Sequence, residues 1–323
     1  YSGGATCPSL LLEPSRTNQC TQSEYIGSID WNQAGITRSL VITQTSETNP
    51  EGASICWKIQ GTASDNQLAN NSSTNSGTTI TNSIYVKRVS GTGNVFLRDV
   101  NNTHTSFSLS VADGWKRIDV TGTATSATAR FYLNLQVSTD EILVWGAQQE
   151  IGAYKTSYIP TYGVSQTRAA DECLLNNSSA LPTDYPFTLY SESIIKSIGS
   201  EVLMSFLNTS DNVSYAAIIT SSGVPSLNAR SGSSDVSLVS PDSVADGIVK
   251  IAGVFESSTL KLFVNGALKA SISNTTTFQS GWNDLLIGQL RTTTDTGDRT
   301  SSKQAIVLPT ALTDAECVTL TTI

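Results

Sequence analysis

The feature that most constrains the fold is a series of short segments in which apolar and polar residues alternate. In ARFYLNLQV, residues 129–137, four apolar side chains fall on one face of an extended chain: Phe131, Leu133, Leu135 and Val137. This period of two is the signature of a half-buried antiparallel strand. Similar segments are SICWKIQ (54–60), TNSIYVKRV (81–89), NVFLRDV (94–100), TSFSLSV (105–111), WKRIDVTG (115–122) and EILVWGAQ (141–148). Strands this short, separated by glycine, asparagine, serine and threonine, predict a β-sandwich.

After Asp171 the same pattern begins again. Further strands are predicted at FTLYSESII (187–195), EVLMSFLN (201–208), YAAIIT (215–220), PSLNARSG (225–232), VKIAGVFES (249–257), LLIGQL (285–290) and KQAIVLP (303–309). In TLKLFVNGALKASIS the alternating residues stop at Asn265-Gly266 and resume after it. Asn-Gly between alternating runs indicates a hairpin with a type I′ turn, because both central residues must tolerate positive φ. The second half is therefore predicted to be another sandwich.

Helix is scarce in this sequence. The one predicted helix is TDAECVTL (313–320), where Thr313 can cap the first turn and Asp314 and Glu316 suit its positive end. The fold class that follows is all-β, with two antiparallel β-sandwich (jelly-roll) domains in tandem.

The segment TSYIPTYGVSQTRAAD, residues 156–171, lies between the two sets of strands. Pro160 removes a backbone donor there and Gly163 allows a bend, so we predict an interdomain connector. The predicted domains are residues 1–163 and 164–323. The tyrosines expected to pack against the sandwiches beside this segment are Tyr154, Tyr158 and Tyr162.

Low charge narrows the partners that the chain can bind. Charged residues make up 14% of the sequence, against about 25% in an average protein. The formal net charge of −8 is spread out and no block of lysine and arginine occurs, so no nucleic-acid partner is expected. No apolar run reaches the ~20 residues of a membrane span, so no membrane insertion is expected. The sequence begins at Tyr1 without a signal peptide, which indicates a processed end with further sequence upstream.

The cysteines and the single histidine give no metal pattern. The five cysteines, Cys7, Cys20, Cys56, Cys173 and Cys317, are irregularly spaced and odd in number, so mainly free thiols are expected. His104 stands in a polar context typical of a solvated loop residue. No metal site, no cofactor and no Ser-His-Asp triad are therefore predicted.

Three stretches carry a resemblance to a known family. YSGGATCPSLLLEPSRTN (1–18) resembles the opening of many tailed-bacteriophage virion proteins, and WGAQQEIGAYKTSYIPTYGVSQTRAAD (145–171) resembles their closing signature. SIYVKR and GWKRIDVTGTAT are similar to the family's middle strands, although Cys20 departs from its usual text. The second half resembles a concanavalin/laminin-G-like jelly roll, with an ending, KQAIVLPTALTDAECVTL, that is common in phage tail-fibre proteins. The resemblance implies a carbohydrate-binding-module-like sandwich followed by a lectin-like sandwich on a phage appendage.

A ligand site is predicted in the polar stretch 281–298, since lectin sites are usually carried by loops. The candidate ligand-binding residues are Trp282, Asn283, Asp284, Arg291 and Asp295. The other tryptophans, Trp31, Trp57, Trp115 and Trp145, are read as core residues in preference to sugar-stacking platforms. The paired acids on alternating strand positions that a glycosidase of this fold requires are missing, so no catalytic residue and no enzyme activity is predicted.

Together these features predict a virion protein on a phage fibre or appendage, a receptor-binding adhesin that recognises host-surface polysaccharide. Its other expected partners are virion proteins and further copies of itself, with a trimer favoured for a fibre. The expected location is the virion surface, after synthesis in the host bacterial cytoplasm. Two alternatives stay open: a structural capsid-decoration or fibre-shaft protein, and the non-catalytic part of a polysaccharide depolymerase.

Overall fold

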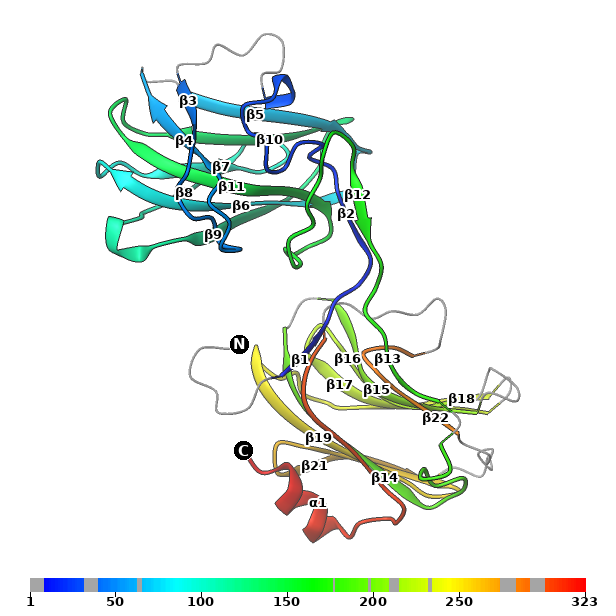
Figure 1. The fold of residues 1–323 in the computed structure, drawn as a ribbon. Helices are drawn as coiled ribbons and strands as arrows, with labels where there is room; N and C mark the ends of the chain where they lie inside the picture. The colour runs from blue at the N-terminus through cyan, green and yellow to red at the C-terminus, as the bar shows by residue number, and fades with distance from the viewer. Residues whose placement is uncertain are drawn as a thin grey trace. The chain divides into compact units, whose positions relative to one another are not determined.

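The computed structural model describes residues 9–31, 40–62, 66–176, 178–196, 199–208, 215–231, 234–273, 283–290 and 300–323 (Figure 1). The chain divides into two compact units. We call Ser15–Ala169 the first sandwich, and Tyr1–Pro14 with Ala170–Ile323 the second sandwich. All described strand pairs in both are antiparallel, which confirms the predicted fold class.

The first sandwich packs a five-stranded sheet against a four-stranded sheet. The first has the order β3-β4-β11-β6-β9 and the second β5-β10-β7-β8. Their bounds are β3 Leu40–Thr45, β4 Cys56–Gly61, β5 Asn66–Ser73, β6 Thr79–Ser90, β7 Val95–Arg98, β8 His104–Phe107, β9 Lys116–Thr123, β10 Thr128–Leu135 and β11 Glu141–Ile151. Two short 3-10 turns, η1 (Ile29–Trp31) and η2 (Val111–Asp113), complete it. Residues from both sheets, among them Ile59, Val144, Leu97 and Phe131, form one buried core.

The second sandwich has two six-stranded sheets. Their orders are β1-β23-β14-β19-β20-β21 and β13-β22-β15-β16-β17-β18. The strands are β1 Leu10–Leu12, β13 Cys173–Leu175, β14 Phe187–Ile195, β15 Ser200–Leu207, β16 Tyr215–Ser221, β17 Val224–Ser231, β18 Ser234–Val239, β19 Gly247–Phe255, β20 Thr259–Val264, β21 Ala267–Ser273, β22 Asp284–Ile287 and β23 Thr300–Leu308. Phe187, Phe206 and Phe255 lie in the core between the sheets.

Two local predictions in the second sandwich are confirmed. Asn265 and Gly266 have φ of 47° and 80° and join β20 to β21, as a type I′ turn requires. Helix α1 (Asp314–Thr321) has Thr313 as its N-cap, with Glu316 completing the capping box. Cys317 on this helix packs against the sheet side chains Tyr190 and Phe263. No helix among the described residues is long and apolar enough to cross a membrane.

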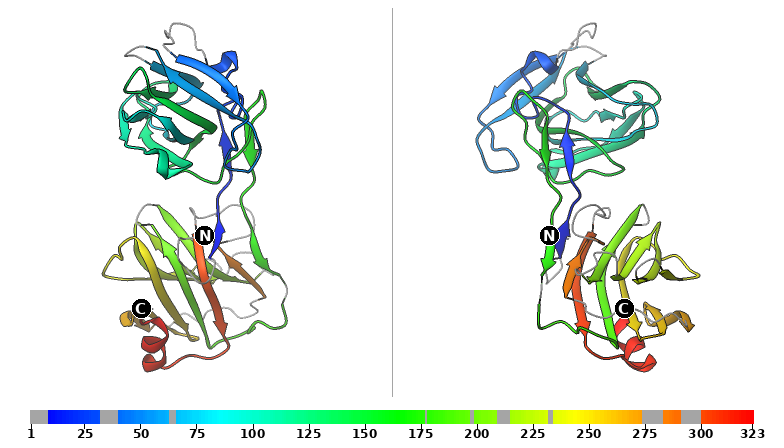
Figure 2. Two further views of the ribbon diagram at one scale, coloured as in Figure 1. Left: turned by 60° about the vertical axis from the view of Figure 1, so that its left-hand side comes forward. Right: turned by 90° about the vertical axis from the view of Figure 1, so that its right-hand side faces the viewer.

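The predicted connector, residues 156–171, belongs largely to the first sandwich. Thr156, Ile159 and Thr161 are buried there. Further along, β12 (Gln166–Arg168) pairs with β2 (Arg16–Asn18), and Figure 2 shows these two strands, green and blue, side by side. Pro160 and Gly163 predicted a connector there. The segment is buried instead because partners elsewhere in the first sandwich, Glu150, Gln148 and Ser23, bond to its polar groups.

The predicted division at 163/164 assigned the start of the chain to the first sandwich, but the structure groups it with the second. Strand β1 pairs with β23, with Leu10 opposite Ser302 and Leu12 opposite Thr300. Residues 1–14 are therefore grouped with the second sandwich, and the chain passes between the two units twice.

Candidate functional site

The predicted site in 281–298 lies mostly outside the described residues. Trp282, Arg291 and Asp295 lie outside the described residues, so the site that they would form stays a prediction. Asn283 is described as a backbone partner: its N–H donates to the carbonyl of Leu207 at 3.0 Å. Asp284 opens β22 and is only 2% exposed, so its carboxylate is not offered to a ligand at the surface.

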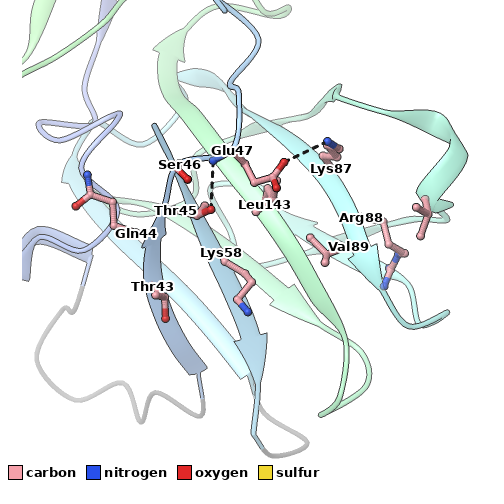
Figure 3. A pocket seen from close by; sticks show the side chains of 11 residues that line it. Thr43, Gln44, Thr45, Ser46, Glu47, Lys58, Lys87, Arg88, Val89 and Leu143 are labelled. Carbon is pink, nitrogen blue, oxygen red and sulfur yellow. Dashed lines mark hydrogen bonds and ion pairs between the residues drawn. The ribbon is translucent and has the colours of Figure 1, made fainter. Parts of the chain in front are cut away.

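A groove lies instead on the outer face of the five-stranded sheet of the first sandwich (Figure 3). It encloses about 700 Å³. Strand β3 supplies one wall, β4 and β11 the floor, and β6 with η2 the other wall. The lining residues are Thr43, Gln44, Thr45, Ser46, Glu47, Lys58, Lys87, Arg88, Val89, Val111 and Leu143. We call this feature the groove.

The floor of the groove follows from strand register. Thr43 lies opposite Lys58, Lys58 opposite Leu143, and Leu143 opposite Lys87, so one row crosses four strands. Alternate residues of each strand point into the core, which leaves this row on the outer face. Leu143 is only 2% exposed, and the two lysines rise on either side of it. Val111 on η2, 58% exposed, adds an apolar edge.

Both signs of charge meet in the groove. The Lys87 Nζ lies 3.9 Å from a Glu47 carboxylate oxygen, and the Lys58 Nζ lies 3.5 Å from Glu141. The Glu47 backbone N–H donates to the Thr45 hydroxyl at 3.2 Å, which holds the loop that carries this carboxylate (Figure 3). Ammonium donors, a carboxylate acceptor and threonine hydroxyls thus converge on a shallow, partly apolar surface. Such a surface suits a ligand with many hydroxyls.

An aromatic layer supports the next row of the same sheet. Trp145 contacts Tyr158 and Tyr85, with ring centroids 4.6 Å and 5.6 Å apart. Burial raises the pKa of the Tyr158 hydroxyl, which is bonded to Ser23 at 2.6 Å. This layer packs directly beside Leu143 and keeps the strands under the groove in place.

The prediction that the tryptophans are core residues is confirmed for three of them. Trp31, Trp57 and Trp145 are 0%, 7% and 2% exposed. Trp115 is half-buried, and its indole N–H donates to the Thr48 carbonyl at 2.8 Å. All four tryptophans therefore contribute to the packing of the first sandwich. His104 is not in a loop as predicted: it begins β8 and its ring contacts Phe96 at 5.0 Å.

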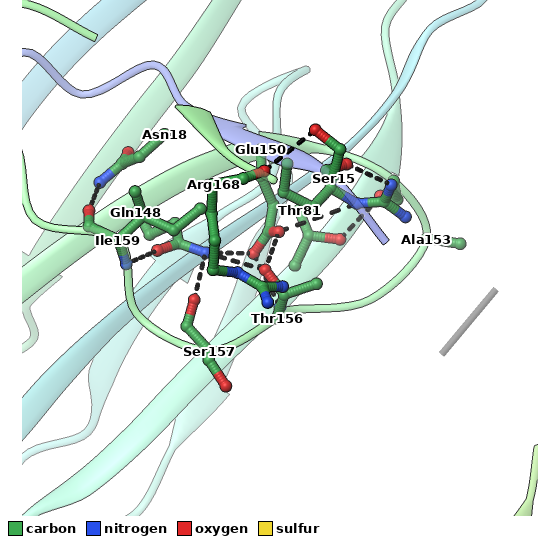
Figure 4. Close-up of polar contacts among 12 residues, drawn as sticks. Ser15, Asn18, Thr81, Gln148, Glu150, Ala153, Thr156, Ser157, Ile159 and Arg168 are labelled. Atoms are coloured by element: carbon green, nitrogen blue, oxygen red, sulfur yellow. Dashed lines mark hydrogen bonds and ion pairs between the residues drawn. The ribbon is translucent and has the colours of Figure 1, made fainter. Parts of the chain in front are cut away.

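The residues that resemble the virion signatures form a buried polar network (Figure 4). The Glu150 carboxylate accepts from the Thr156 N–H at 2.9 Å, the Thr156 hydroxyl at 2.6 Å and the Gln148 amide at 2.6 Å. Arg16 Nε approaches the same carboxylate to 3.9 Å. The Gln148 carbonyl oxygen in turn accepts from the Ile159 N–H at 2.8 Å. The opening and closing motifs therefore tie the two ends of the first sandwich together.

Glu192 and Asp140, two acids on or next to strands, lie in ion pairs. Glu192 lies 2.9 Å from Lys303. Asp140 and Arg88, both 1% exposed, form what we call the buried ion pair, at 3.1 Å. No group of three metal-ligating side chains occurs in the described part of the chain. The four described cysteines are free thiols, while Cys7 lies outside the described residues.

Sequence reasoning missed the groove because its residues come from five separate segments. The signal was present in β6, where Tyr85, Lys87 and Val89 alternate with buried residues. A strand whose outer face carries tyrosine and lysine is typical of any exposed sheet, so the pattern could not single out a site.

Comparisons with known proteins identify the fold of the second half. Residues 169–304 match the family model of the concanavalin A-like lectin/glucanases superfamily. The second sandwich is concanavalin A-like. This agrees with the lectin-like domain that the sequence resemblance predicted. The match covers less than half of the chain, and a comparison with the curated proteins gives no match.

Several solved structures are similar to part of the chain. The CBM40 of the Ruminococcus gnavus IT-sialidase, bound to α2,3-sialyllactose, is 17% identical with a TM-score of 0.39, over 44% of this chain and 84% of that chain. The leech intramolecular trans-sialidase is 16% identical with a TM-score of 0.41, over 47% of this chain and 26% of that one. The SAP-like pentraxin of Limulus polyphemus is 17% identical with a TM-score of 0.36, over 43% and 70%.

Proposed function

We propose that this chain is a glycan-binding protein without catalytic activity, serving as a receptor-binding adhesin on a phage fibre or appendage. The observation that carries the proposal is the groove, where Lys87, Glu47 and Thr43 line the same hollow as the exposed apolar side chains of Val89 and Val111. Ammonium and carboxylate groups together can bond to neighbouring sugar hydroxyls, one as donor and the other as acceptor. The two exposed valines suit the C–H face of a sugar ring.

The lectin-superfamily match of residues 169–304 supports the same function from the other half of the chain. The resemblance of residues 1–18 and 145–171 to virion proteins supports the location. A shallow groove binds a single glycan weakly, and several copies on one particle would raise the overall affinity. Host attachment requires binding of this kind, which is reversible at each site and strong in sum.

A glycan array probed with the full chain tests the proposal. The variants Glu47→Gln and Lys87→Gln remove one charge each at nearly constant shape, and Lys196→Gln on the second sandwich is the matched control. Loss of one charged hydrogen-bonding group is expected to weaken binding about 3- to 10-fold. The control is expected to bind as the wild type does. Equal binding by all four proteins would assign recognition to another site, and an array without any hit would refute glycan binding.

The virion location has a separate test. Purified phage particles of the source should carry the chain, detected by mass spectrometry and removed together with appendages on mild dissociation. If the chain is found on particles but binds no glycan on the array, the result favours a structural capsid-decoration or fibre-shaft protein over an adhesin.

A further inference from the structure

The outer face of the four-stranded sheet in the first sandwich has an unusual composition. Its strands β5, β10, β7 and β8 read NQLANNSS, TARFYLNL, VFLR and HTSF, without a single aspartate or glutamate. Two arginines and one histidine are present, in a chain whose formal net charge is −8. The charged side chains within these four strands are therefore all cationic, although the protein as a whole is acidic.

Strand register places the cations together on the outer face. Arg98 lies opposite Tyr132 on one side and opposite His104 on the other. Arg130 is two residues before Tyr132 on the same strand, so it points to the same face. It is therefore a diagonal neighbour of Arg98, and the Cα atoms of such neighbours are about 7–8 Å apart. We call Arg98, Arg130, Tyr132 and His104 the arginine face.

Arg98 is held in position by neutral groups. Its Nε donates to the Asn134 amide oxygen at 3.0 Å and its Nη1 to the Asn102 amide oxygen at 2.8 Å. The guanidinium carbon lies 6.0 Å from the centre of the Tyr132 ring. Neither amide neutralises the charge, and three of the five N–H groups of the guanidinium stay available for a ligand. The arginine is thus oriented without being compensated.

Arg130 is likewise uncompensated. Its cross-strand neighbour is Asn71, another amide. Within the described residues, no carboxylate lies within ion-pair distance of either arginine. Most other cations of the described chain sit beside an acid, as Lys58, Lys87 and Lys116 do. Arg98 and Arg130 lack such an acidic partner among the residues that the structure describes, and a negatively charged ligand could take its place.

We propose that the arginine face binds a carboxylate-bearing polysaccharide. Guanidinium groups match the geometry of carboxylates, and two of them on a diagonal can engage successive acidic sugars along an extended chain. Half-buried Tyr132 and Phe96 offer ring surface between them, and the exposed Gln136 offers an amide to sugar hydroxyls. The inference rests on the proposed glycan-binding function and adds the chemical class of the glycan and a second surface for it.

The test uses the full chain and two forms of one polymer: oligogalacturonate and its fully methyl-esterified derivative, which keeps the sugars and loses the charge. The variants are Arg98→Gln and Arg130→Gln. Lys116→Gln, on the opposite sheet, removes the same charge elsewhere. Arg130→Gln breaks no side-chain hydrogen bond among the described residues, so its fold is expected to be intact, and a melting curve checks both arginine variants.

The expected result is binding of the acidic oligomer alone, weakened about tenfold by each arginine variant and unchanged by Lys116→Gln. Raising the salt concentration should weaken it further, because exposed charges are screened. Equal binding of the esterified oligomer, or equal affinity of all variants, would overturn the proposal. Equal competition by single-stranded DNA would also overturn it, because the face would then bind any polyanion. If glycans bind through the groove while the arginine variants change nothing, the proposed function stands and this inference fails.

Discussion

Among the buried carboxylates of the first sandwich, Glu150 is the one whose replacement we expect to lower the free energy of unfolding most. Its side chain is fully buried, accepts three hydrogen bonds from Gln148 and Thr156, and lies near Arg16. Glu150→Ala would leave these donors buried without an acceptor. Hydrogen bonds to a charged group contribute about 1.5–3 kcal/mol each and are not additive. Breaking one side of a buried charged network costs about 3–5 kcal/mol, which is the loss in unfolding free energy that we expect.

The matched control lies on the same strand. Glu141 pairs with Lys58 at 3.5 Å, with side chains 21% and 37% exposed, and Glu141→Ala should cost less than about 1 kcal/mol. Urea unfolding followed by tryptophan fluorescence reports the first sandwich, because four of the five tryptophans lie in it. The midpoint for Glu150→Ala should fall by more than about 1 M urea relative to wild type. Coinciding midpoints for the two variants would refute the stabilising role given to the buried polar network around Glu150.

Three further outcomes are expected. Gly91→Ala should cost at least about 3 kcal/mol, because the glycine has positive φ and an added Cβ would meet the carboxylate of the buried ion pair at 1.9 Å. Gly52→Ala, with positive φ but open space, should cost only about 1 kcal/mol when both variants are followed by the same urea unfolding; equal losses for the two variants would refute the role of the close contact. Iodoacetamide at pH 8 should modify half-buried Cys173 well before Cys56, whose pKa burial raises to about 11, as peptide mass spectrometry would show, and the reverse order would contradict the burial argument. Residues 15–169 expressed alone should melt cooperatively, since they hold a complete core, and a broad or absent transition would count against an autonomous unit.

Much of the fold follows from alternation in the sequence, and the exceptions have physical causes. The hairpin at Asn265-Gly266 could be predicted because the signal is local: two residues with positive φ between regular strands. Strand β5 reads NQLANNSS and was not predicted, because only Leu68 and its neighbours face the core while the rest is polar. The pairing of β1 with β23 joins segments far apart in sequence, and three residues carry no pattern that could specify it.

Most of segment 156–171 is packed within the first sandwich, where an interdomain connector was predicted. Polar residues such as Thr156 and Thr161 predict a solvated connector when they are read one at a time. They are buried because Glu150 and Ser23 supply their partners from elsewhere in the chain. Burial of a polar group depends on whether a partner meets it, which only the folded chain decides. The groove depends on the same kind of convergence.

The central claim, that the chain binds polysaccharide without cleaving it, is tested most directly by affinity electrophoresis in gels containing host-surface polysaccharide, with reducing ends followed in the same mixture. The account predicts that the polysaccharide retards the wild-type chain, that Lys87→Gln is retarded less, and that reducing ends stay constant with time. Unretarded migration would contradict binding. Reducing ends that increase with the amount of pure protein, and cease to do so when one of its carboxylates is replaced, would contradict the absence of catalysis.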